Sequence, residues 1–311
     1  MNFHDRIKIF KRACARYGLF VSSWFITRLP YSLMKVIMYV FMAIGSCFII
    51  RHHRLARESL HIAFDQEKDP QEIRRIAQDC FENIGRGMME LIYFMAHPQM
   101  IMEKVVIDGK EHLDQALSQR RGVIAVSAHF GNFPLMLLRF ARAGYKTNAI
   151  IRPTRDQEIE KYFLDLRTKL GLNTIYSLPR KICVDTSLKV LRNNELLFIT
   201  LDQNFGSAGG VFVDFFGQKA ATATGPVVFA RRTKAPILPM FIIRDHGDVY
   251  KVIIEPPLEL EEKENDEEAV LVNTTKITNI IERYIRQYPH EWGWMHRRWK
   301  TKPPAGETVM V

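Results

Sequence analysis

The first 57 residues combine a helical spacing of apolar positions with two uncharged stretches. Apolar residues recur every three or four positions, as on one face of an α-helix, at Phe3, Ile7, Phe10, Cys14, Tyr17 and Val21. Two apolar runs, 17–27 and 36–50, lie on either side of Arg28, Pro30 and Lys35. A membrane-spanning helix needs about 20 apolar residues, so the pattern predicts helices that lie in a membrane interface. The alternative is an apolar hairpin packed on the protein's own core.

Beyond this region the pattern predicts one long helix followed by alternating strands and helices. Asp69 and Pro70 are typical of a helix start, and helical spacing continues until Pro98 stops it. Short apolar runs predict strands over 122–128, 147–152, 174–178, 195–201, 237–243 and 249–254. Helices are predicted over 135–143, 157–170, 186–192, 226–233 and 275–288, and the acidic segment 255–268 is interpreted as a loop. This alternation predicts an α/β fold whose largely parallel sheet is flanked by helices.

The composition narrows the classes of protein that fit. At 311 residues, 47% hydrophobic and 25% charged, the chain has the proportions of a folded globular protein, which excludes disordered and low-complexity classes. The cysteines lack paired spacing, so neither a zinc site nor a disulfide framework is predicted; they are Cys14, Cys47, Cys80 and Cys183. The sequence contains no phosphate-binding loop, dinucleotide-binding motif or hydrolase serine motif. We therefore expect no metal and no cofactor.

The positive charge is concentrated at the N-terminus. The net charge is +10, yet residues 1–57 hold ten Lys or Arg against one acid, which leaves a charge of only +1 on the other 254 residues. Such an asymmetry indicates binding to an anionic surface. Because these cations adjoin apolar runs, we expect this surface to be a membrane and not a nucleic acid. The chain is accordingly divided into a membrane-associating region, 1–57, and a single α/β domain, 58–311.

A second aromatic and basic segment lies near the C-terminus. Its residues are Trp292, Trp294, His296, Arg297, Arg298, Trp299 and Lys300. Amphipathic rings beside cations are typical of the headgroup level of a membrane, so this segment predicts a second membrane contact. In the alternative interpretation the tryptophans fill the core and the arginines pair with acids.

Candidate site residues follow three of the predicted strands. In open α/β sheets, ligands bind beyond the carboxyl ends of the strands. The residues at these ends are His129, Gly131, Asn132, Arg152, Pro153, Asp202, Gln203 and Asn204. We expect a histidine, an arginine and a carboxylate to converge on one cleft there. The alternatives are a histidine that is only part of the folded core and, for Arg152, a surface ion pair.

An ordered set of motifs resembles a known enzyme family. The motifs are residues 51–64, Met89-Glu90, 127–132, Ile151-Arg152-Pro153, Leu201-Asp202-Gln203, 212–217 with Ala221-Thr222, and 292–299. Their order and content are similar to those of the late acyltransferases of lipid A biosynthesis, the lauroyl and myristoyl transferases within the lysophospholipid acyltransferase superfamily. The resemblance covers nearly the whole chain.

The resemblance implies a fold, a reaction and a location. It implies an acyltransferase-like α/β domain that transfers a fatty acyl chain from an acyl-carrier-protein or CoA thioester to a hydroxyl of a lipid A-type glycolipid. The reaction would take place at the cytoplasmic face of the bacterial inner membrane. The expected partners are therefore the acyl carrier protein, a membrane glycolipid acceptor and an anionic membrane surface, with no nucleic acid.

The resemblance also implies a role for each candidate residue. His129 would act as general base, because a neutral hydroxyl is a poor nucleophile. Main-chain N–H groups at the start of the following helix would stabilise the oxyanion. Arg152 would hold a phosphate or polarise the thioester carbonyl. The other substrate-binding residues would be Gly131, Asn132, Pro153, Gln203 and Asn204.

Position 134 departs from the pattern of this family. The family carries an acid five residues after the histidine, but this sequence has Pro134 at that place. Three alternatives follow. Asp202 orients His129 instead, or His129 works unaided and slowly, or the protein is a catalytically lapsed relative that binds acyl lipids at a membrane.

Overall fold

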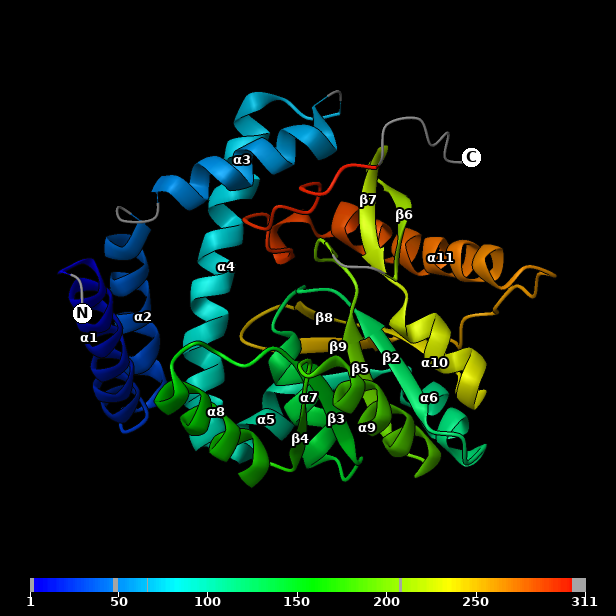
Figure 1. Ribbon diagram of the computed structural model, residues 1–311. Coiled ribbons are helices and arrows are strands. Elements are labelled where there is room, and N and C mark those ends of the chain that lie inside the picture. Colours follow the sequence, from blue (N-terminus) through cyan, green and yellow to red (C-terminus); the bar gives the residue numbers. More distant parts are fainter. Residues whose placement is uncertain (1–2, 47–49, 66, 207–208, 304–311) are drawn as a thin grey trace.

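The centre of the molecule is a mixed sheet, seen in a computed structural model that describes residues 3–46, 50–65, 67–206 and 209–303 (Figure 1). Within these residues seven strands form the sheet: β1 (Val105–Asp108), β2 (Val123–Ser127), β3 (Thr147–Ile151), β4 (Leu172–Tyr176), β5 (Leu196–Thr200), β8 (Ile237–Arg244) and β9 (Tyr250–Ile254). The strand order is β1-β9-β8-β2-β5-β3-β4, and all neighbours are parallel except β8 and β9. The predicted α/β class with a largely parallel sheet is therefore confirmed.

Helices cover both faces of this sheet. Alternate residues of a strand point to opposite faces, and in β2 Ile124 and Val126 belong to one apolar cluster whereas Val123 and Ala125 belong to the other. The first cluster includes residues of α9 (Arg180–Arg192), α10 (Gly225–Thr233) and α11 (Asp266–Gln287). The second includes residues of α5 (Pro98–Lys104), α6 (Lys110–Ser118) and α7 (Phe133–Arg142), and Leu166 of α8 (Gln157–Lys169) packs against it. Strands buried on both faces read as continuous apolar runs, which is why the sequence predicts them well.

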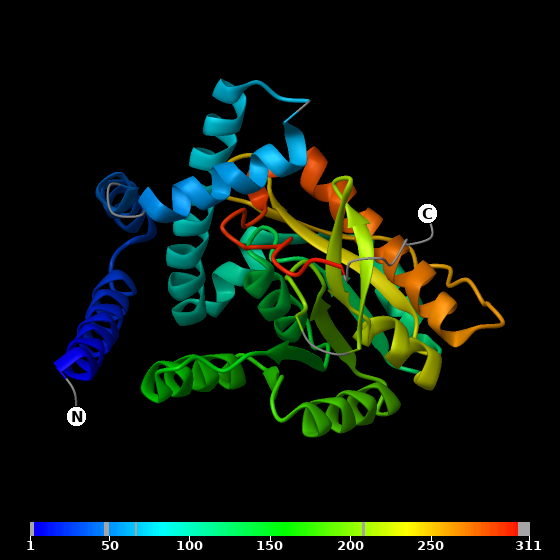
Figure 2. The same ribbon diagram turned by 45° about the horizontal axis from the view of Figure 1, so that its top comes forward.

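The long helix α4 (Pro70–Ala96) begins and ends where the sequence predicts. The Oδ1 atom of Asp69 accepts the main-chain N–H groups of Gln71 at 2.7 Å and Glu72 at 2.8 Å, which caps the helix. The helix ends just before Pro98. It runs alongside the N-terminal helices (Figures 1 and 2), so it connects them with the sheet.

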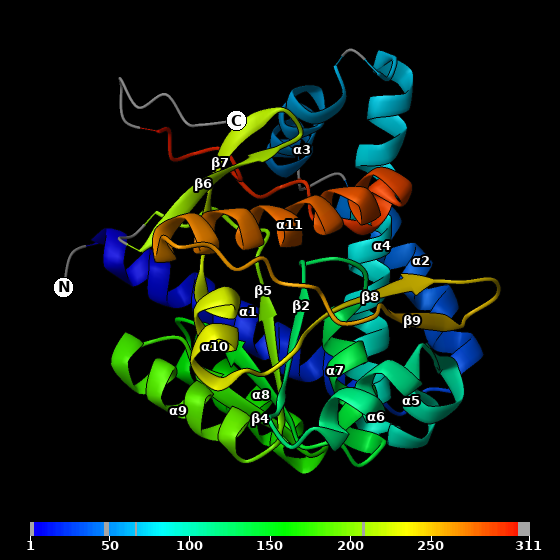
Figure 3. The ribbon, with the colours of Figure 1, turned by 90° about the vertical axis from the view of Figure 1, so that its right-hand side faces the viewer.

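Several elements differ from the sequence prediction. The sequence does not predict the short elements β1, α5 and α6. The helix predicted over 186–192 is α9, which begins six residues earlier, at Arg180. The sequence also misses a hairpin of β6 (Gly210–Phe215) and β7 (Gln218–Ala223), which forms a separate two-stranded sheet. The hairpin packs on α11 (Figure 3). Segments of this length carry too few apolar positions to define a period.

The start of α11 corrects the interpretation of residues 255–268 as a loop. The helix begins at Asp266, nine residues before the predicted start, and the Asn265 side chain accepts the main-chain N–H of Glu267 at 2.8 Å. Asp266, Glu267 and Glu268 form the first turn. Carboxylates are stabilising there because the N-terminus of a helix carries partial positive charge. These three acids therefore belong to the start of a helix and not to the loop that the sequence predicts.

The N-terminal helices are packed on one side and exposed on the other. They are α1 (Phe3–Ile26), α2 (Tyr31–Ser46) and α3 (Ile50–Phe64), drawn in blue in Figure 1. Ile26, Met34 and Met38 are buried, whereas large apolar side chains are exposed at Tyr17, Val21, Trp24, Phe25, Leu33, Val36, Tyr39 and Val40. No helix among the described residues is both long enough and apolar enough to cross a membrane. The proposed boundary at residue 57 falls inside α3, and the division of the chain there stays a prediction.

Candidate active site

His129 lies in a tight turn between β2 and α7, which we call the His129 turn (residues 129–132). Gly131 has a φ of +56°, in the left-handed region that favours glycine. A Cβ atom at this position would lie only 2.0 Å from the main-chain oxygen of Ile242. The turn therefore depends on glycine for its shape and for its close approach to β8.

The His129 imidazole is hydrogen-bonded to a buried carboxylate. Asp202 follows β5, the neighbour of β2, and its Oδ1 lies 2.9 Å from His129 Nδ1. The Asp202 side chain is fully buried, whereas that of His129 is 30% exposed. Trp292 Nε1 donates to the second carboxylate oxygen at 2.8 Å. Pro134 lies in the first turn of α7, so Asp202 occupies the role of hydrogen-bond partner that position 134 leaves vacant.

The two groups shift each other's pKa. Burial alone would lower the pKa of His129, but the charge of Asp202 and its hydrogen bond outweigh burial and raise it. Burial alone would raise the pKa of Asp202, yet the His129 charge and the hydrogen bonds from His129 and Trp292 hold it well below the usual range. At neutral pH Asp202 is therefore a carboxylate, and it stabilises a proton on the imidazole.

A second histidine lies beside this pair. The ring centroids of His129 and His296 are 5.4 Å apart. Gln203 Nε2 lies 3.1 Å from His129 Nε2 and 3.4 Å from His296 Nε2. Because His129 Nδ1 faces the carboxylate, we assign its proton to Nδ1, which leaves Nε2 as an acceptor. Sequence reasoning did not include His296 among the site residues, although it lies within the motif of residues 292–299.

The other predicted site residues have different surroundings. Asn132 is buried, and its Nδ2 donates to the main-chain oxygen of Gly87 at 3.0 Å. Asn204 Nδ2 donates to the Thr301 hydroxyl oxygen, and Asn204 Oδ1 accepts the main-chain N–H of Thr301, both at 3.0 Å. Arg152 and Pro153 are exposed, and in the described part of the chain the Arg152 side chain has neither a hydrogen bond nor an ion pair. The structure thus brings His129, Asp202 and Gln203 together, while Arg152 does not join them through a direct contact.

The C-terminal aromatic segment is part of the core, which overturns its prediction as a membrane contact. Trp292, Trp294 and Trp299 are buried. Arg298 is also buried, and its guanidinium donates to the main-chain oxygens of Ala221 at 2.6 Å and Gln203 at 3.3 Å. Burial lowers the pKa of Arg298 to about 10. The alternative of a core segment is correct for the tryptophans, but Arg298 binds carbonyl oxygens instead of acids.

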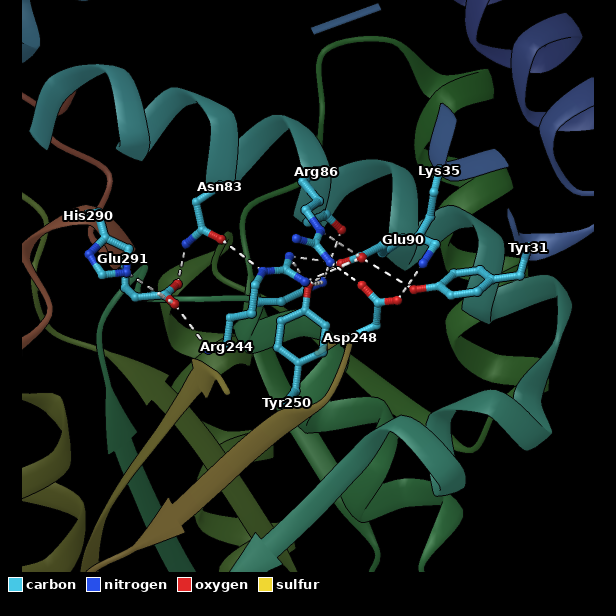
Figure 4. Close-up of polar contacts among 12 residues, drawn as sticks. Tyr31, Lys35, Asn83, Arg86, Glu90, Arg244, Asp248, Tyr250, His290 and Glu291 are labelled. Atoms are coloured by element: carbon cyan, nitrogen blue, oxygen red, sulfur yellow. Dashed lines mark hydrogen bonds and ion pairs between the residues drawn. The ribbon is translucent and has the colours of Figure 1, made fainter. Parts of the chain in front are cut away.

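A polar network around the buried Glu90 is drawn in Figure 4, and it adjoins the His129 turn through a contact between Tyr250 and Asn132. The fully buried carboxylate of Glu90 accepts from Arg86 Nε at 3.0 Å, from Arg244 Nη2 at 2.8 Å and from the Tyr250 hydroxyl. The same hydroxyl lies 3.4 Å from Asn132 Nδ2. Glu90 is thus connected to the turn through Tyr250. Sequence reasoning did not assign Glu90 to the site, although it belongs to the Met89-Glu90 motif.

A metal centre has no counterpart in the described residues. No group of three or more His, Cys, Asp or Glu side chains among them is arranged to hold a metal ion. The groups that the structure does bring together are His129, Asp202 and the hydrogen-bonding side chains of Gln203 and Trp292 around them.

Known proteins are similar to this chain over most of its length. The lipid A biosynthesis lauroyltransferase of Escherichia coli (strain K12) is 27% identical over 284 residues, 90% of this chain and 89% of that protein. The lipid A biosynthesis palmitoleoyltransferase of the same organism is 26% identical over 292 residues, 93% and 92% of the two chains. A phosphatidylinositol mannoside acyltransferase of Mycobacterium tuberculosis (strain CDC 1551 / Oshkosh) is 23% identical over 195 residues, 62% and 60% of the two chains.

A single family model matches residues 1–301, and its description is bacterial lipid A biosynthesis acyltransferase. The match includes the N-terminal helices, the His129 turn and the C-terminal aromatic segment, as the resemblance of the motifs predicts. Because this model spans nearly the whole sequence, the chain belongs to the family of bacterial lipid A biosynthesis acyltransferases.

Proposed function

We propose that this protein transfers a fatty acyl chain from an acyl-carrier-protein or CoA thioester to a hydroxyl group of a lipid A-type glycolipid. The observation that carries the proposal is the 2.9 Å contact between His129 Nδ1 and the buried Asp202 carboxylate, since it supplies the acid that Pro134 does not. Membership of the family supports acyl transfer. The lauroyl and palmitoleoyl relatives are almost equally similar, so the proposal names the class of fatty acyl chain and not one length.

His129 is the general base in this proposal. Its Nε2 removes the proton from the acceptor hydroxyl as the oxygen forms a bond with the thioester carbonyl carbon. The resulting tetrahedral oxyanion collapses, the carbon–sulfur bond breaks, and the carrier thiolate takes the proton from the imidazolium. Asp202 stabilises the imidazolium between these steps, because its negative charge lies against Nδ1.

The oxyanion and the acceptor need further groups near His129. Pro134 carries no N–H, so Phe133, at the first position of α7, is the proposed main-chain donor to the oxyanion. Gln203 is proposed to release His129 Nε2 when the acceptor hydroxyl replaces its amide. Arg152, exposed after β3, is proposed to bind a phosphate of the acceptor or to polarise the carbonyl.

We further propose that the protein works at the cytoplasmic face of the bacterial inner membrane. The support is the row of exposed apolar side chains on α1 and α2, which lies within the strongly basic first 57 residues. Arg28 stacks on the exposed ring of Trp24 with its guanidinium carbon 4.2 Å from the ring centroid. A cation over an amphipathic ring is suited to anionic headgroups. The acyl carrier protein would then approach from the aqueous side.

The test is an acyl-transfer assay with purified protein, an acyl-carrier-protein thioester and a lipid A precursor. His129→Ala and Asp202→Asn should each lower turnover by about 10²- to 10⁴-fold, the usual contribution of a positioned base. The double variant should lose little more, because residues that act as one unit are not additive. Turnover that survives His129→Ala would rule out this mechanism.

Pro134 favours one further candidate function, a lapsed enzyme that only binds acyl lipids at the membrane. The variant Pro134→Glu separates the two. If Asp202 already serves His129, the added acid changes activity little. If the parent protein shows no transfer while Pro134→Glu gains it, the lapsed enzyme is the better description.

A further inference from the structure

We infer that Glu291 is a positioning residue which, held by Asn83 and Arg244, keeps His129 and Asp202 at hydrogen-bonding distance; the inference rests on the proposed function of that pair. Glu291 lies directly before Trp292, the residue that donates to Asp202. It also contacts the His129 turn. One residue is thus connected to both members of the pair.

The main chain of Glu291 supports the His129 turn. Its carbonyl oxygen accepts the N–H of Gly131 at 2.8 Å. The next residues form an isolated antiparallel bridge, Phe130 with Trp292, and Gly293 N–H points to the carbonyl of His129 at 3.4 Å. The segment 291–293 therefore runs along the turn as a short strand would, and a shift of Glu291 would shift the turn with it.

The side chain of Glu291 fixes this segment in the interior. It is 2% exposed, and its Oε1 accepts the main-chain N–H of Arg244, at the end of β8, at 3.0 Å. Its Oε2 accepts from Asn83 Nδ2 on α4, and the Asn83 Oδ1 accepts from Arg244 Nε at 3.3 Å. These three residues close a ring of hydrogen bonds, which Figure 4 shows at the left of the polar network. We call it the Glu291 ring (Asn83, Arg244 and Glu291).

The ring is specific for a carboxylate at one position and an amide at the other. Both oxygens of Glu291 accept hydrogen bonds, and Asn83 donates with its nitrogen while it accepts with its oxygen. A buried polar group that loses its partner is costly. Replacing Glu291 by Gln would turn one acceptor into a donor that faces Asn83 Nδ2, and the segment would have to move. The Trp292 to Asp202 bond and the Gly131 bond would then loosen together.

This arrangement permits an exchange experiment. In the double variant Asn83→Asp/Glu291→Gln, the new carboxylate on α4 accepts from the new amide and from Arg244 Nε, while the amide oxygen accepts the Arg244 N–H. Every donor and acceptor finds a partner, and the net charge is that of the parent. Glu291→Gln breaks the ring, and Asn83→Ala breaks it without a change of charge. Glu82→Gln is the matched control, because Glu82 accepts from an amide, Gln78 Nε2, at 2.9 Å on the exposed side of the same helix.

Two measurements are made on all variants. The first is acyl transfer, for which Glu291→Gln and Asn83→Ala should lower kcat by about 10- to 100-fold, the effect of a small misplacement of reacting groups, with KM nearly unchanged. The second is the NMR titration of the His129 ring, assigned by its loss in His129→Ala. Asp202 and His296 face this ring, and the parent pKa should lie above the ordinary value of about 6.5. Both breaking variants should lower it, and the exchange variant should restore pKa and kcat.

The outcomes separate the inference from the proposed function. If the parent shows no acyl transfer, the proposed function fails, and the titration of His129 still tests the Glu291 ring. The inference is overturned if the His129 pKa in Glu291→Gln and Asn83→Ala equals that of the parent, or if the exchange variant is as defective as Glu291→Gln. Should Glu291→Gln fail to fold, Asn83→Ala carries the same prediction. An exchange variant that fails to fold counts against the inference, because the exchange preserves the ring.

Discussion

Two segments that place tryptophan near basic residues, the N-terminal helices and the C-terminal residues 292–300, have opposite environments. Both combine tryptophan with basic residues. Trp24 on α1 is 59% exposed, whereas Trp292 is fully buried. The indole N–H of Trp292 donates to Asp202, and the indole N–H of Trp294 donates to the Pro289 carbonyl. Within the residues described here, the Trp24 indole N–H has no acceptor. Composition does not distinguish the two environments, but the acceptors that the fold supplies do.

The largest effect is expected from removing the Asp202 carboxylate, which accepts the indole N–H of the buried Trp292. General-base catalysis needs neutral His129, and Asp202 raises its pKa, so the parent kcat/KM should rise with pH through a pKa above the ordinary value. Asp202→Asn removes the charge that raises it. Activity should fall by about 10²- to 10⁴-fold, and the acid limb of the remaining pH profile should move to lower pH.

The measurement is kcat/KM across pH for parent and variant, because this ratio reports the free enzyme. The matched control is Asp108→Asn, which removes an exposed carboxylate at the end of β1 that is ion-paired with Lys251 at 2.7 Å. An acid limb that stays in place in Asp202→Asn would contradict the assignment of this limb to His129.

The second prediction concerns Arg298 and its exposed neighbour. Arg298→Met removes the donor from the Gln203 carbonyl and the Thr222 hydroxyl oxygen in the interior, while the Ala221 carbonyl loses one donor and keeps the Phe205 N–H at 3.0 Å. Each buried acceptor left unpaired costs about 1–3 kcal/mol, so the free energy of unfolding should fall by about 2–4 kcal/mol. Arg297→Met is the matched control, since Arg297 is exposed, and it should change the value by less than about 0.5 kcal/mol. The free energy of unfolding of both variants is measured by denaturant titration. An equal loss of stability in the two variants would contradict the buried role of Arg298.

The sequence predicts best those parts of the fold whose residues are determined locally. The Asp69 side chain caps α4 with its own hydrogen bonds, and Pro70 suits the first helical position. In β2, successive positions are apolar because helices cover both sides of the sheet. The order of strands and helices predicts that His129 and Asp202 each follow a strand, but the pairing of these two strands, β2 and β5, is known only from the structure. The contact between His129 and Asp202 was one of three alternatives that the sequence left open, because Pro134 removes the usual partner.

The remainder depends on contacts between distant parts of the chain. Glu291 and Asn83 are 208 residues apart, and no local pattern relates them. The same holds for Arg298, whose acceptors lie on β7 and after β5. The sequence predicts a membrane contact for Trp292 and Arg298, which are buried, because rings beside cations fit both a membrane interface and a core with internal acceptors.

The third prediction compares the same substitution in the two segments. Trp292→Phe leaves the second oxygen of Asp202 without its donor in the interior, so stability should fall by about 1–3 kcal/mol. Trp24→Phe removes no internal hydrogen bond and should change stability by less than about 0.5 kcal/mol. The free energy of unfolding of the two variants is measured by denaturant titration. A cost for Trp24→Phe equal to that of Trp292→Phe would mean that α1 is not exposed in solution.

The smallest effect is expected on the exposed side, where α2 offers apolar side chains to a membrane. Val36 and Val40 are 59% and 53% exposed and lie four positions apart, on one face of the helix. Replacing both by Ser removes apolar surface that would enter the interface, and at about 0.8 kcal/mol per buried CH₂ the affinity for anionic vesicles should fall by about tenfold. Stability should stay the same, since neither side chain is in the core.

Vesicle sedimentation measures the affinity, and thermal unfolding checks that the variant remains folded. The matched control is Ile62→Ser/Val106→Ser, at exposed apolar positions on α3 and β1, which should leave binding unchanged. Unchanged binding in the Val36→Ser/Val40→Ser variant would place the membrane contact elsewhere. A loss of stability there would instead show that α2 packs on the protein along this face as well. The inner side of α2 is held to the rest of the protein by the ion pair between Lys35 and Asp248 at 2.6 Å. Neither substitution touches this ion pair, so the vesicle experiment tests the exposed face of α2 alone.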